Sequence, residues 1–386
     1  MMPSPRRRVA LLLEHRTSFD RRVVRGVAGY ARENAWELLS EAYGDVGSSA
    51  LRSHFFGAIV AVTDRRQWRR LRNWRIPVVN VSGAVATPDL PTVCSDNAAI
   101  GRIAAEHFLE RGFRHFAFAG PPAVLGSSER LQGFTERLGE AGYDVEALDC
   151  EVDWAGRWQR ERIRLERWVS HLLKPFALFV VNDILARRVL QVCERQGIQV
   201  PDQCAVLGVG DYALLNALAP IPISSVVQDA EQIGRLAAEL LTELAEGRLR
   251  DAALRLLVPP LGVVARQSSD TNAVDHPQLS IALDFIRSNL GQGLRVSDLA
   301  EHLAVSRRWL EMQFQQHLGC SPRAMIRSQQ VSLAKRLLVE TDWPLSLIAR
   351  RCGMASPERL STMFRGSEGL PPSIYRARMR AYGSDL

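Results

Sequence analysis

The chain has 386 residues, of which 46% are hydrophobic and 24% charged, so it is long enough for two or three globular domains with ordinary cores. Its net charge is +7, and residues 271–386 hold most of the excess, with 15 basic and 10 acidic residues. No run approaches about 18 apolar residues, and the run after the basic start is too short for a signal peptide, which predicts a cytoplasmic protein without a membrane span.

Short apolar runs alternate with amphipathic segments from residue 8 to about residue 269. This alternation indicates βαβ units and parallel sheets. Because about 260 residues exceed what one sheet usually holds, we predict two similar lobes within residues 1–269, with a break near residue 120. The runs expected to form strands are VALLLE (9–14), GAIVAVT (57–63), PVVNVSG (77–83), HFAFAG (115–120), FALFVVND (176–183) and CAVLGVGD (204–211).

The polar segment SSDTNAVDHPQ breaks the alternation, so we interpret residues 270–278 as a linker. Residues 279–386 then show helical patterns only, which predicts an all-α domain. This last third also carries most of the excess positive charge, as expected for a part that contacts phosphates.

The helical region contains an internal repeat of about 50 residues. Eight matched positions with a one-residue insertion indicate duplicated structure rather than chance. The matched residues are Leu299, Ala300, Leu303, Ser306, Leu310, Phe314, Gly319 and Pro322 in the first copy, and Ile348, Ala349, Cys352, Ser356, Leu360, Phe364, Gly369 and Pro372 in the second.

Each copy has the pattern of a helix-turn-helix unit. A short helix leads into a turn, where Gly353 can adopt a positive φ at low cost in the second copy. Ser306 or Ser356 then caps the next helix, and Pro357 fits its first position, where no amide hydrogen is needed.

The second helix of each copy presents polar residues outward and can enter a DNA major groove N-terminus first. The alternative is a pair of helical hairpins with solvated outer faces. Two copies joined by a long helix, Ser321–Thr341, favour DNA binding, with adjacent major grooves as the expected target. The candidate DNA-reading residues are Arg307, Arg308, Glu311, Met312, Pro357, Glu358, Arg359 and Thr362.

Residues 279–380 resemble the AraC-type DNA-binding domain, in which a long helix bridges two helix-turn-helix units. The resemblance rests on LAEHLAVSRRWLEMQFQQHLGCSP and IARRCGMASPERLSTMFRGSEGLPPSIYR. Met354, Met363, Thr362 and the segment GSEG depart from common choices in that family, which leaves the base preference open.

Residues 8–269 resemble the effector-binding region of LacI/GalR regulators, on strings such as SDNAAIGRIAAEHFLERGFRHFAFAG, VVNDILARRVLQVCERQGIQVPD and ISSVVQDAEQIGRLAAELL. That region shares the fold of periplasmic sugar-binding proteins. The two resemblances together imply a two-lobed α/β domain of the periplasmic-binding-protein type, followed by an all-α domain with two helix-turn-helix units.

Polar residues stand at or near the ends of the expected strands, where ligands of parallel sheets bind. A sugar hydroxyl donates to a carboxylate and accepts from a guanidinium. The LacI-like pattern matches Arg130 and Asp183 with ligand-contacting positions, and Asp211 less closely. The loop HRTSFDRR adds a stacking ring and polar contacts. The candidate effector residues are Phe19, Asp20, Arg21, Arg130, Asp183 and Asp211.

Structural alternatives exist for these residues. Asp183 can cap the helix expected over 184–197, and Arg130 can pair with Glu129 or Glu136 at the surface. Phe19 can belong to the core. Asp96 is expected to cap the helix that follows it.

The domain order resembles that of activators of sugar operons. It implies a transcription regulator that binds double-stranded operator DNA as a homodimer and responds to a sugar, such as the pentose xylose, bound between the two lobes. No GxSxG, HExxH or P-loop occurs and no histidine has a ligand-spaced partner, so we expect neither an enzyme nor a metal or cofactor. The alternatives are a non-exported sugar receptor or a sugar-modifying enzyme with a helical appendage.

Overall fold

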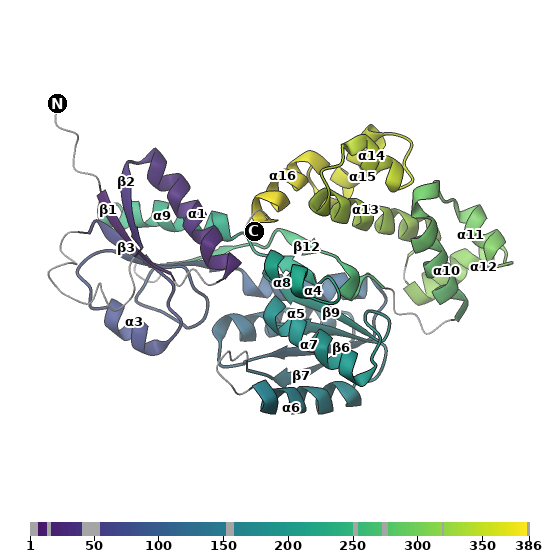
Figure 1. Cartoon of the computed structure of the whole chain (residues 1–386), viewed down its shortest axis with the longest axis horizontal. Coiled ribbons are helices and arrows are strands. Elements are labelled where there is room, and N and C mark those ends of the chain that lie inside the picture. Colours follow the sequence, from purple (N-terminus) through teal and green to yellow (C-terminus); the bar gives the residue numbers. More distant parts are fainter. Residues whose placement is uncertain are drawn as a thin grey trace. The chain divides into compact units, whose positions relative to one another are not determined.

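The structure is a computed structural model that describes residues 7–13, 17–40, 55–151, 158–249, 254–271, 277–318 and 320–383. The chain divides into two compact units (Figure 1). The first comprises Met1–Ile103, Gly120–Arg137 and Val226–Gly262, and the second comprises Ala104–Ala119, Leu138–Ser225 and Val263–Leu386. No described helix is both long and apolar enough to cross a membrane.

A six-stranded sheet with the order β11-β5-β4-β3-β1-β2 forms the centre of the first unit. Each neighbouring pair is parallel, as the strand–helix alternation predicted. The strands are β1 (Arg7–Leu12), β2 (Trp36–Ser40), β3 (Gly57–Val60), β4 (Val78–Asn80), β5 (Thr92–Ser95) and β11 (Arg255–Val258). The helices that begin in this unit are α1 (Ser18–Glu33), α3 (Arg65–Leu71), α4 (Asn97–Leu109), α5 (Leu125–Glu140) and α9 (Ala230–Ala245).

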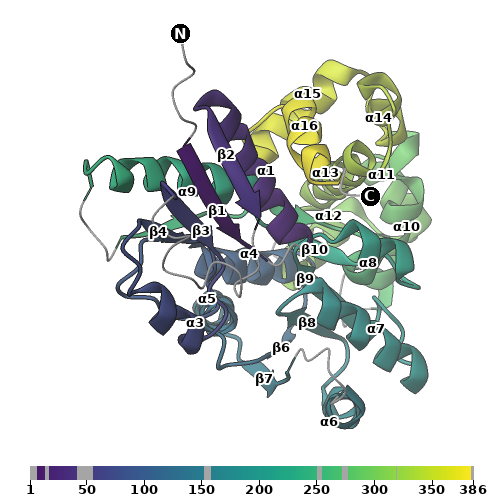
Figure 2. The same ribbon diagram turned by 60° about the vertical axis from the view of Figure 1, so that its left-hand side comes forward.

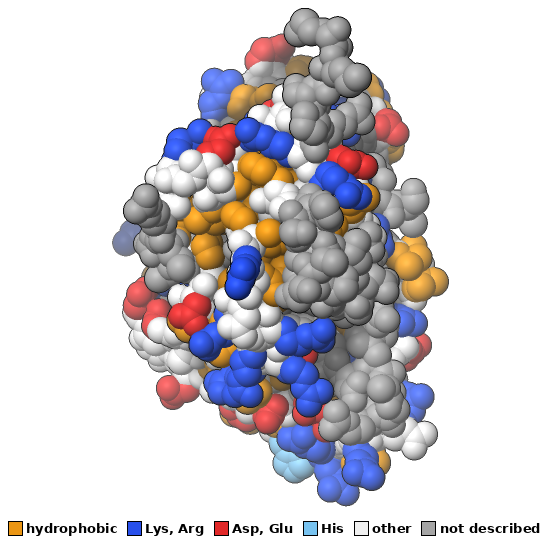
Figure 3. All heavy atoms as spheres, turned by 90° about the vertical axis from the view of Figure 1, so that its left-hand side faces the viewer, with side chains coloured by type: hydrophobic (Ala, Val, Ile, Leu, Met, Phe, Trp, Pro, Cys, Tyr) orange, Lys and Arg blue, Asp and Glu red, His pale blue; other side chains and the backbone are white. Residues whose placement is uncertain are grey.

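Both faces of this sheet are buried. Successive side chains of β1 point to opposite faces, and each set lies in a core cluster of its own. Val9 and Leu11 pack with residues of α1 and α9 in one core cluster, and Ala10 and Leu12 belong to a second cluster with Leu71 of α3. Figure 2 shows α1 and α9 beside the sheet. Figure 3 shows the face of the molecule that lies on the left in Figure 1, where a group of hydrophobic side chains has basic and acidic side chains around it.

Helices α1 and α9 cross at two glycines. A Cβ placed at Gly26 would lie 1.9 Å from the Glu231 carbonyl oxygen, and one at Gly234 would lie 2.0 Å from the Val23 carbonyl oxygen. Any larger residue at either position would push the helices apart, so this crossing fixes α1 and its first turn against the sheet.

The second unit holds another six-stranded sheet, with the order β12-β10-β9-β8-β6-β7. Its central pairs β6–β8 and β8–β9 are parallel. The strands are β6 (His115–Gly120), β7 (Val145–Asp149), β8 (Phe176–Val180), β9 (Cys204–Val209), β10 (Ser224–Val227) and β12 (Gly262–Val264), and the helices α6 (Trp158–His171), α7 (Asp183–Gln196) and α8 (Ala213–Leu218) connect them.

The chain passes between the two sheets three times: from β5 to β6, from β10 to β11, and from β11 to β12. The sequence pattern suggested one break, near residue 120. The other two passages depend on the pairing of β11 with β5, which joins segments about 160 residues apart in the chain. A local sequence pattern carries no signal for such a pairing.

The helical region also belongs to the second unit. Residues 272–276 of the expected linker lie outside the described residues, and α10 begins at Pro277, two residues before the expected start of the helical domain at 279. The helices are α10 (Pro277–Asn289), α11 (Val296–His302), α12 (Arg307–Leu318), α13 (Pro322–Glu340), α14 (Leu345–Arg351), α15 (Pro357–Glu368) and α16 (Pro372–Gly383).

Candidate DNA-binding and effector sites

The internal repeat forms two helix-turn-helix units, α11–α12 and α14–α15, bridged by α13 (Figure 1). The Ser306 hydroxyl accepts a hydrogen bond from the Trp309 amide at 3.1 Å, and the Ser356 hydroxyl accepts one from the Arg359 amide at 3.4 Å. Pro357 occupies the first turn of α15. The predicted caps and the predicted bridging helix are therefore confirmed.

The second helix of each unit is amphipathic. Leu310 and Phe314 of α12, and Leu360 and Phe364 of α15, are fully buried. The candidate reading residues lie on the opposite side. One of them, Pro357, is half-buried, and the other seven are exposed. The exposed seven are Arg307, Arg308, Glu311, Met312, Glu358, Arg359 and Thr362. These outer faces offer guanidinium, carboxylate, hydroxyl and thioether groups, the types of contact that base edges accept.

Both carboxylates among these residues, those of Glu311 and Glu358, have local partners. Arg307 Nε lies 2.9 Å from Glu311 Oε1, one turn along α12. The Ser356 hydroxyl and a backbone amide lower the pKa of Glu358. This lowered pKa keeps Glu358 charged at neutral pH. An ionised carboxylate at the tip of a reading helix repels DNA phosphates but can accept a hydrogen bond from a cytosine amino group.

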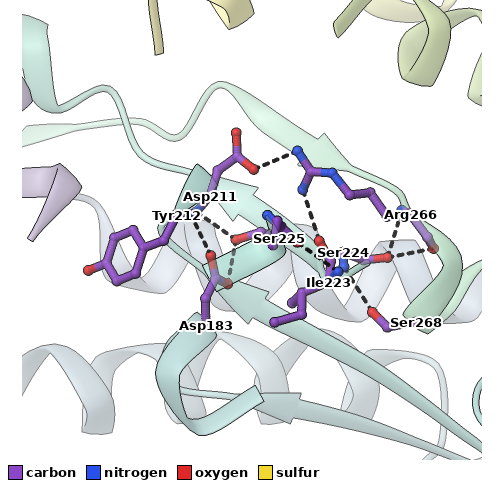
Figure 4. A network of polar contacts seen from close by, with 9 residues as sticks. Asp183, Asp211, Tyr212, Ile223, Ser224, Ser225, Arg266 and Ser268 are labelled. Carbon is purple, nitrogen blue, oxygen red and sulfur yellow. Dashed lines mark hydrogen bonds and ion pairs between the residues drawn. The ribbon is translucent and has the colours of Figure 1, made fainter. Parts of the chain in front are cut away.

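Asp183 lies at the centre of a polar network in the second unit (Figure 4). Its Oδ1 accepts from the Ser225 hydroxyl at 2.7 Å, and its Oδ2 accepts from the Tyr212 amide at 2.9 Å. The alternative in which Asp183 caps α7 is wrong, because Asn182 is the cap: its side chain accepts from the Leu185 amide at 2.9 Å.

The carboxylate of Asp183 occupies space left by a glycine. A Cβ added at Gly208 of β9 would lie 2.2 Å from Asp183 Oδ1. Asp183 is fully buried, and this burial raises the pKa of its carboxyl to about 6, although the hydrogen bonds from Tyr212 and Ser225 lower it. A buried carboxylate with a raised pKa beside a strand end is typical of a functional site.

Asp211 follows β9 and has an internal partner. Its Oδ1 lies 2.7 Å from Arg266 Nη2, and both side chains are about nine-tenths buried. Arg266 also donates to the Ile223 carbonyl at 2.9 Å. Asp211 adopts φ 52°, a conformation that few non-glycine residues take. The ion pair fixes the loop that supplies the Tyr212 amide to Asp183, so Asp211 has a positioning role whether or not it contacts a ligand.

The candidate residues of the first unit form a separate group. Arg130 on α5 donates from Nε to Asn97 Oδ1 at 2.9 Å. Glu129 pairs with Arg255 at 2.7 Å, and Glu136 lies 3.7 Å from Arg102. As expected, Asp96 caps α4, by accepting from the Ala99 amide at 2.9 Å.

Phe19, Asp20 and Arg21 form the first turn of α1, rather than the loop expected there. Phe19 is half-buried and packs against the core cluster of this unit, which supports its core alternative. Asp20 accepts from the Thr17 hydroxyl at 2.8 Å, within the cap of α1. Arg21 is exposed, so it is the one of the three whose side chain is most open to a ligand. A role for these three in effector binding stays a prediction.

Sequence reasoning missed three members of the Asp183 network: Tyr212, Ser225 and Arg266. Tyr212 acts through its backbone amide, which no residue type reveals. Ser225 lies in SSVV, which is too polar to be recognised as a strand, whereas Arg266 had one usable signal, a charged residue directly after the apolar segment GVVA.

The raised pKa of Asp183 predicts a pH dependence of stability. The folded chain binds a proton here more tightly than the unfolded chain does, so this stabilisation is full below about pH 4 and is lost as pH rises through about 6. We expect the unfolding free energy of the unaltered chain, minus that of Asp183→Asn, to fall by about 2 kcal/mol between pH 4.5 and pH 7. Urea unfolding of both chains at a series of pH values measures this difference. Parallel pH curves would contradict the shift.

Two domain families match the chain. Residues 105–269 match a periplasmic binding protein-like domain, and residues 299–378 match a helix-turn-helix domain. The chain is 29% identical over 385 residues to the xylose operon regulatory protein of Escherichia coli strain K12. The aligned residues cover 97% of this chain and 98% of that protein. It is 28% identical over 379 residues to the protein of the same name from Haemophilus influenzae, and the aligned residues cover 96% of this chain and 98% of that protein.

Solved structures agree with these two domain matches. The structure of a xylose-binding transcription activator matches with a TM-score of 0.65 and 28% identity, over 97% of this chain and 99% of that one. A periplasmic binding protein/LacI transcriptional regulator from Alkaliphilus metalliredigens, in complex with D-xylulofuranose, matches with a TM-score of 0.57 and 20% identity over 69% of this chain and 100% of that one, a likeness of fold alone. The predicted fold is confirmed: a periplasmic-binding-protein-like α/β domain precedes a helical domain with two helix-turn-helix units.

Proposed function

We propose that this chain, a DNA-binding transcription regulator that joins a periplasmic-binding-protein-like effector domain to an AraC-type helix-turn-helix domain, activates genes for the use of a pentose. The observation that carries the proposal is the similarity to xylose operon regulators through both domains and nearly the whole of each chain. The two exposed reading helices and the buried carboxylate of Asp183 supply the matching chemistry.

The effector is proposed to be a sugar because of the polar groups present. A carboxylate held by two internal donors still has lone pairs that can accept from a sugar hydroxyl. Arg130 of the first unit is proposed as a further ligand contact, on the basis of its match to the LacI/GalR pattern. The proposal assigns the chain no catalytic step, since its relatives are regulators.

On the DNA side, we propose that the chain acts in the cytoplasm as a homodimer on an operator with two half-sites. Sugar binding would shift the population between two arrangements of the reading helices, only one of which fits the operator spacing. The size of the response is then set by the difference in sugar affinity between the two arrangements.

A thermal-shift screen of the purified full chain tests the effector. D-xylose should raise the unfolding midpoint more than other pentoses and hexoses at equal concentration, by the linkage between binding and stability. The same preparation should select a preferred duplex from a random DNA library. If no sugar shifts the midpoint, the effector class is wrong. If no duplex is enriched, the regulatory function is wrong.

Arg308→Ala tests whether the first reading helix contacts a base. Arg308 is exposed in the first turn of α12, where the N-terminus of a reading helix meets base edges. Loss of one good base contact should cost about 1–3 kcal/mol, roughly 5- to 150-fold in affinity, on the selected duplex. Fluorescence anisotropy on that duplex and on a scrambled one measures the effect. Equal losses on both duplexes would assign Arg308 to phosphate, and no loss would remove it from the DNA surface.

A further inference from the structure

A basic groove lies within the helical domain, between its two helix-turn-helix units. It has a volume of about 790 Å³ and is open to solvent. Its walls come from the residues before and within α11, from the start of α12, from one side of α13, and from the turn and reading helix of the second unit. The groove therefore connects the two candidate reading surfaces along the bridging helix.

Among the residues that the structure describes, five arginines line this groove and no aspartate or glutamate does. All five are exposed. Within the described part of the chain, one of the five, Arg307, pairs with a carboxylate, that of Glu311. The groove is therefore a concentration of positive charge that the protein itself leaves largely unneutralised. The five are Arg295, Arg307, Arg323, Arg327 and Arg359.

The placement of Arg323 and Arg327 does not favour folding. They lie one turn apart on α13, so their like charges repel each other. Arg323 also lies in the first turn of α13, where the helix dipole disfavours a cation. The buried side of this helix segment is apolar, with Met325 and Ile326 in the core cluster. Both arginines reach into the groove instead, and a polyanion in the groove would remove both unfavourable contributions.

We infer that Arg323 and Arg327, with Arg295, bind consecutive phosphates of the DNA backbone in the stretch that connects the two segments read by α12 and α15. The inference rests on the proposed DNA binding and specifies which part of the DNA occupies the groove. A duplex carries one negative charge per about 1.7 Å of axis, so a groove with this density of guanidinium groups suits its backbone. Arg307 and Arg359 belong to both the groove and the reading helices, which makes the surface continuous.

The experiment compares Arg323→Ala/Arg327→Ala with the control Arg350→Ala. Arg350 is an exposed arginine of the same domain that lies outside the groove, and its replacement removes one charge. The probe is the duplex selected from the random library by the unaltered chain. The dependence of log affinity on log salt should become less steep by about 0.9 for each lost phosphate contact, and affinity near 0.15 M salt should fall by about fivefold per contact. The slope for Arg350→Ala should stay unchanged.

Two further measurements locate the contact. Arg323→Lys/Arg327→Lys keeps both charges and should retain most of the salt dependence. Neutral methylphosphonate linkages can be placed in the duplex between the segments read by α12 and α15. They should weaken DNA binding by the unaltered chain and leave DNA binding by the double alanine variant unchanged.

Each result separates the inference from the proposed function. If the unaltered chain binds no duplex, the proposed function fails. If it binds, but the double alanine variant has the slope of the Arg350→Ala control, the groove does not hold the backbone. If the slope changes but linkages elsewhere in the duplex account for it, the assignment to the connecting stretch is wrong. The variants replace exposed side chains, so their unfolding midpoints should remain close to that of the unaltered chain.

Discussion

Replacing Gly353 by alanine should destabilise the second helix-turn-helix unit by about 3 kcal/mol or more. Gly353 forms the turn before α15 with φ 69°, where an L-residue costs about 1–2 kcal/mol. A Cβ there would also lie 2.0 Å from the Leu290 carbonyl oxygen and 2.9 Å from the Gly293 amide nitrogen. These neighbours are backbone atoms, so the 3₁₀ turn that contains Leu290 or the α14–α15 turn must move.

The first copy of the repeat provides the matched control. Ala304 occupies the equivalent turn position with φ 52° and is exposed, so this turn already tolerates a Cβ. Ala304→Gly should relieve the positive-φ strain and leave the chain unchanged in stability, or more stable by up to about 1 kcal/mol. Turn conformation alone predicts changes of similar size and opposite sign at the two equivalent positions, so a loss at Gly353 much larger than the gain at Ala304 would identify the packing against Leu290 as the main cost.

The measurement is urea unfolding of both variants in the full chain, with DNA binding of the same preparations by anisotropy. Gly353→Ala should lose most specific affinity, because α15 depends on this turn for its placement. A Gly353→Ala chain with normal unfolding and normal affinity would show that the turn shifts at little cost, and the packing against Leu290 would then be unimportant.

The helical domain was the part of the fold most fully predicted from sequence, because its signals are local. Ser306, Ser356 and Pro357 act within one turn of where they stand in the chain. The α/β region was predicted less completely. All six apolar runs contain strands, but β2, β5, β7, β10, β11 and β12 were not predicted. Several of these are short or at sheet edges, and TVCS or SSVV contains too few apolar residues to be distinguished from a loop.

The candidate effector residues illustrate the same limit. Asp183 was identified from the end of an apolar run, and the structure confirms its place beside β8. Its partners Ser225 and Arg266 come from β10 and from the segment after β12, which only the folded sheet brings to Asp183 and Asp211. Residue types at strand ends indicate candidate site residues, whereas the hydrogen-bond partners of each residue depend on the order of strands in the sheet.

Asp183→Asn should abolish the response to D-xylose while leaving the chain folded. The amide is nearly isosteric with the carboxylate, and its oxygen can accept from the Tyr212 amide. Its NH2 group can donate to the Ser225 oxygen, whose hydroxyl hydrogen can rotate away. At neutral pH the substitution also removes a negative charge from a buried site that disfavours it, which helps to keep the chain folded.

The loss of binding follows from the same exchange. A carboxylate accepts at both oxygens, whereas the amide presents a donor where a sugar hydroxyl would donate, and an ionic hydrogen bond is worth about 1.5–3 kcal/mol. We expect the affinity for D-xylose to fall by about 10- to 150-fold, and the sugar-dependent change in DNA binding to be lost at sugar concentrations that saturate the unaltered chain. Asp144→Asn, the same change at an exposed position, is the matched control and should respond normally.

Gly208→Ala should reproduce the loss with Asp183 intact, because its methyl group would lie against Asp183 Oδ1. Calorimetric titration with D-xylose measures all four chains, and an unaltered affinity in Asp183→Asn would exclude Asp183 from the effector site.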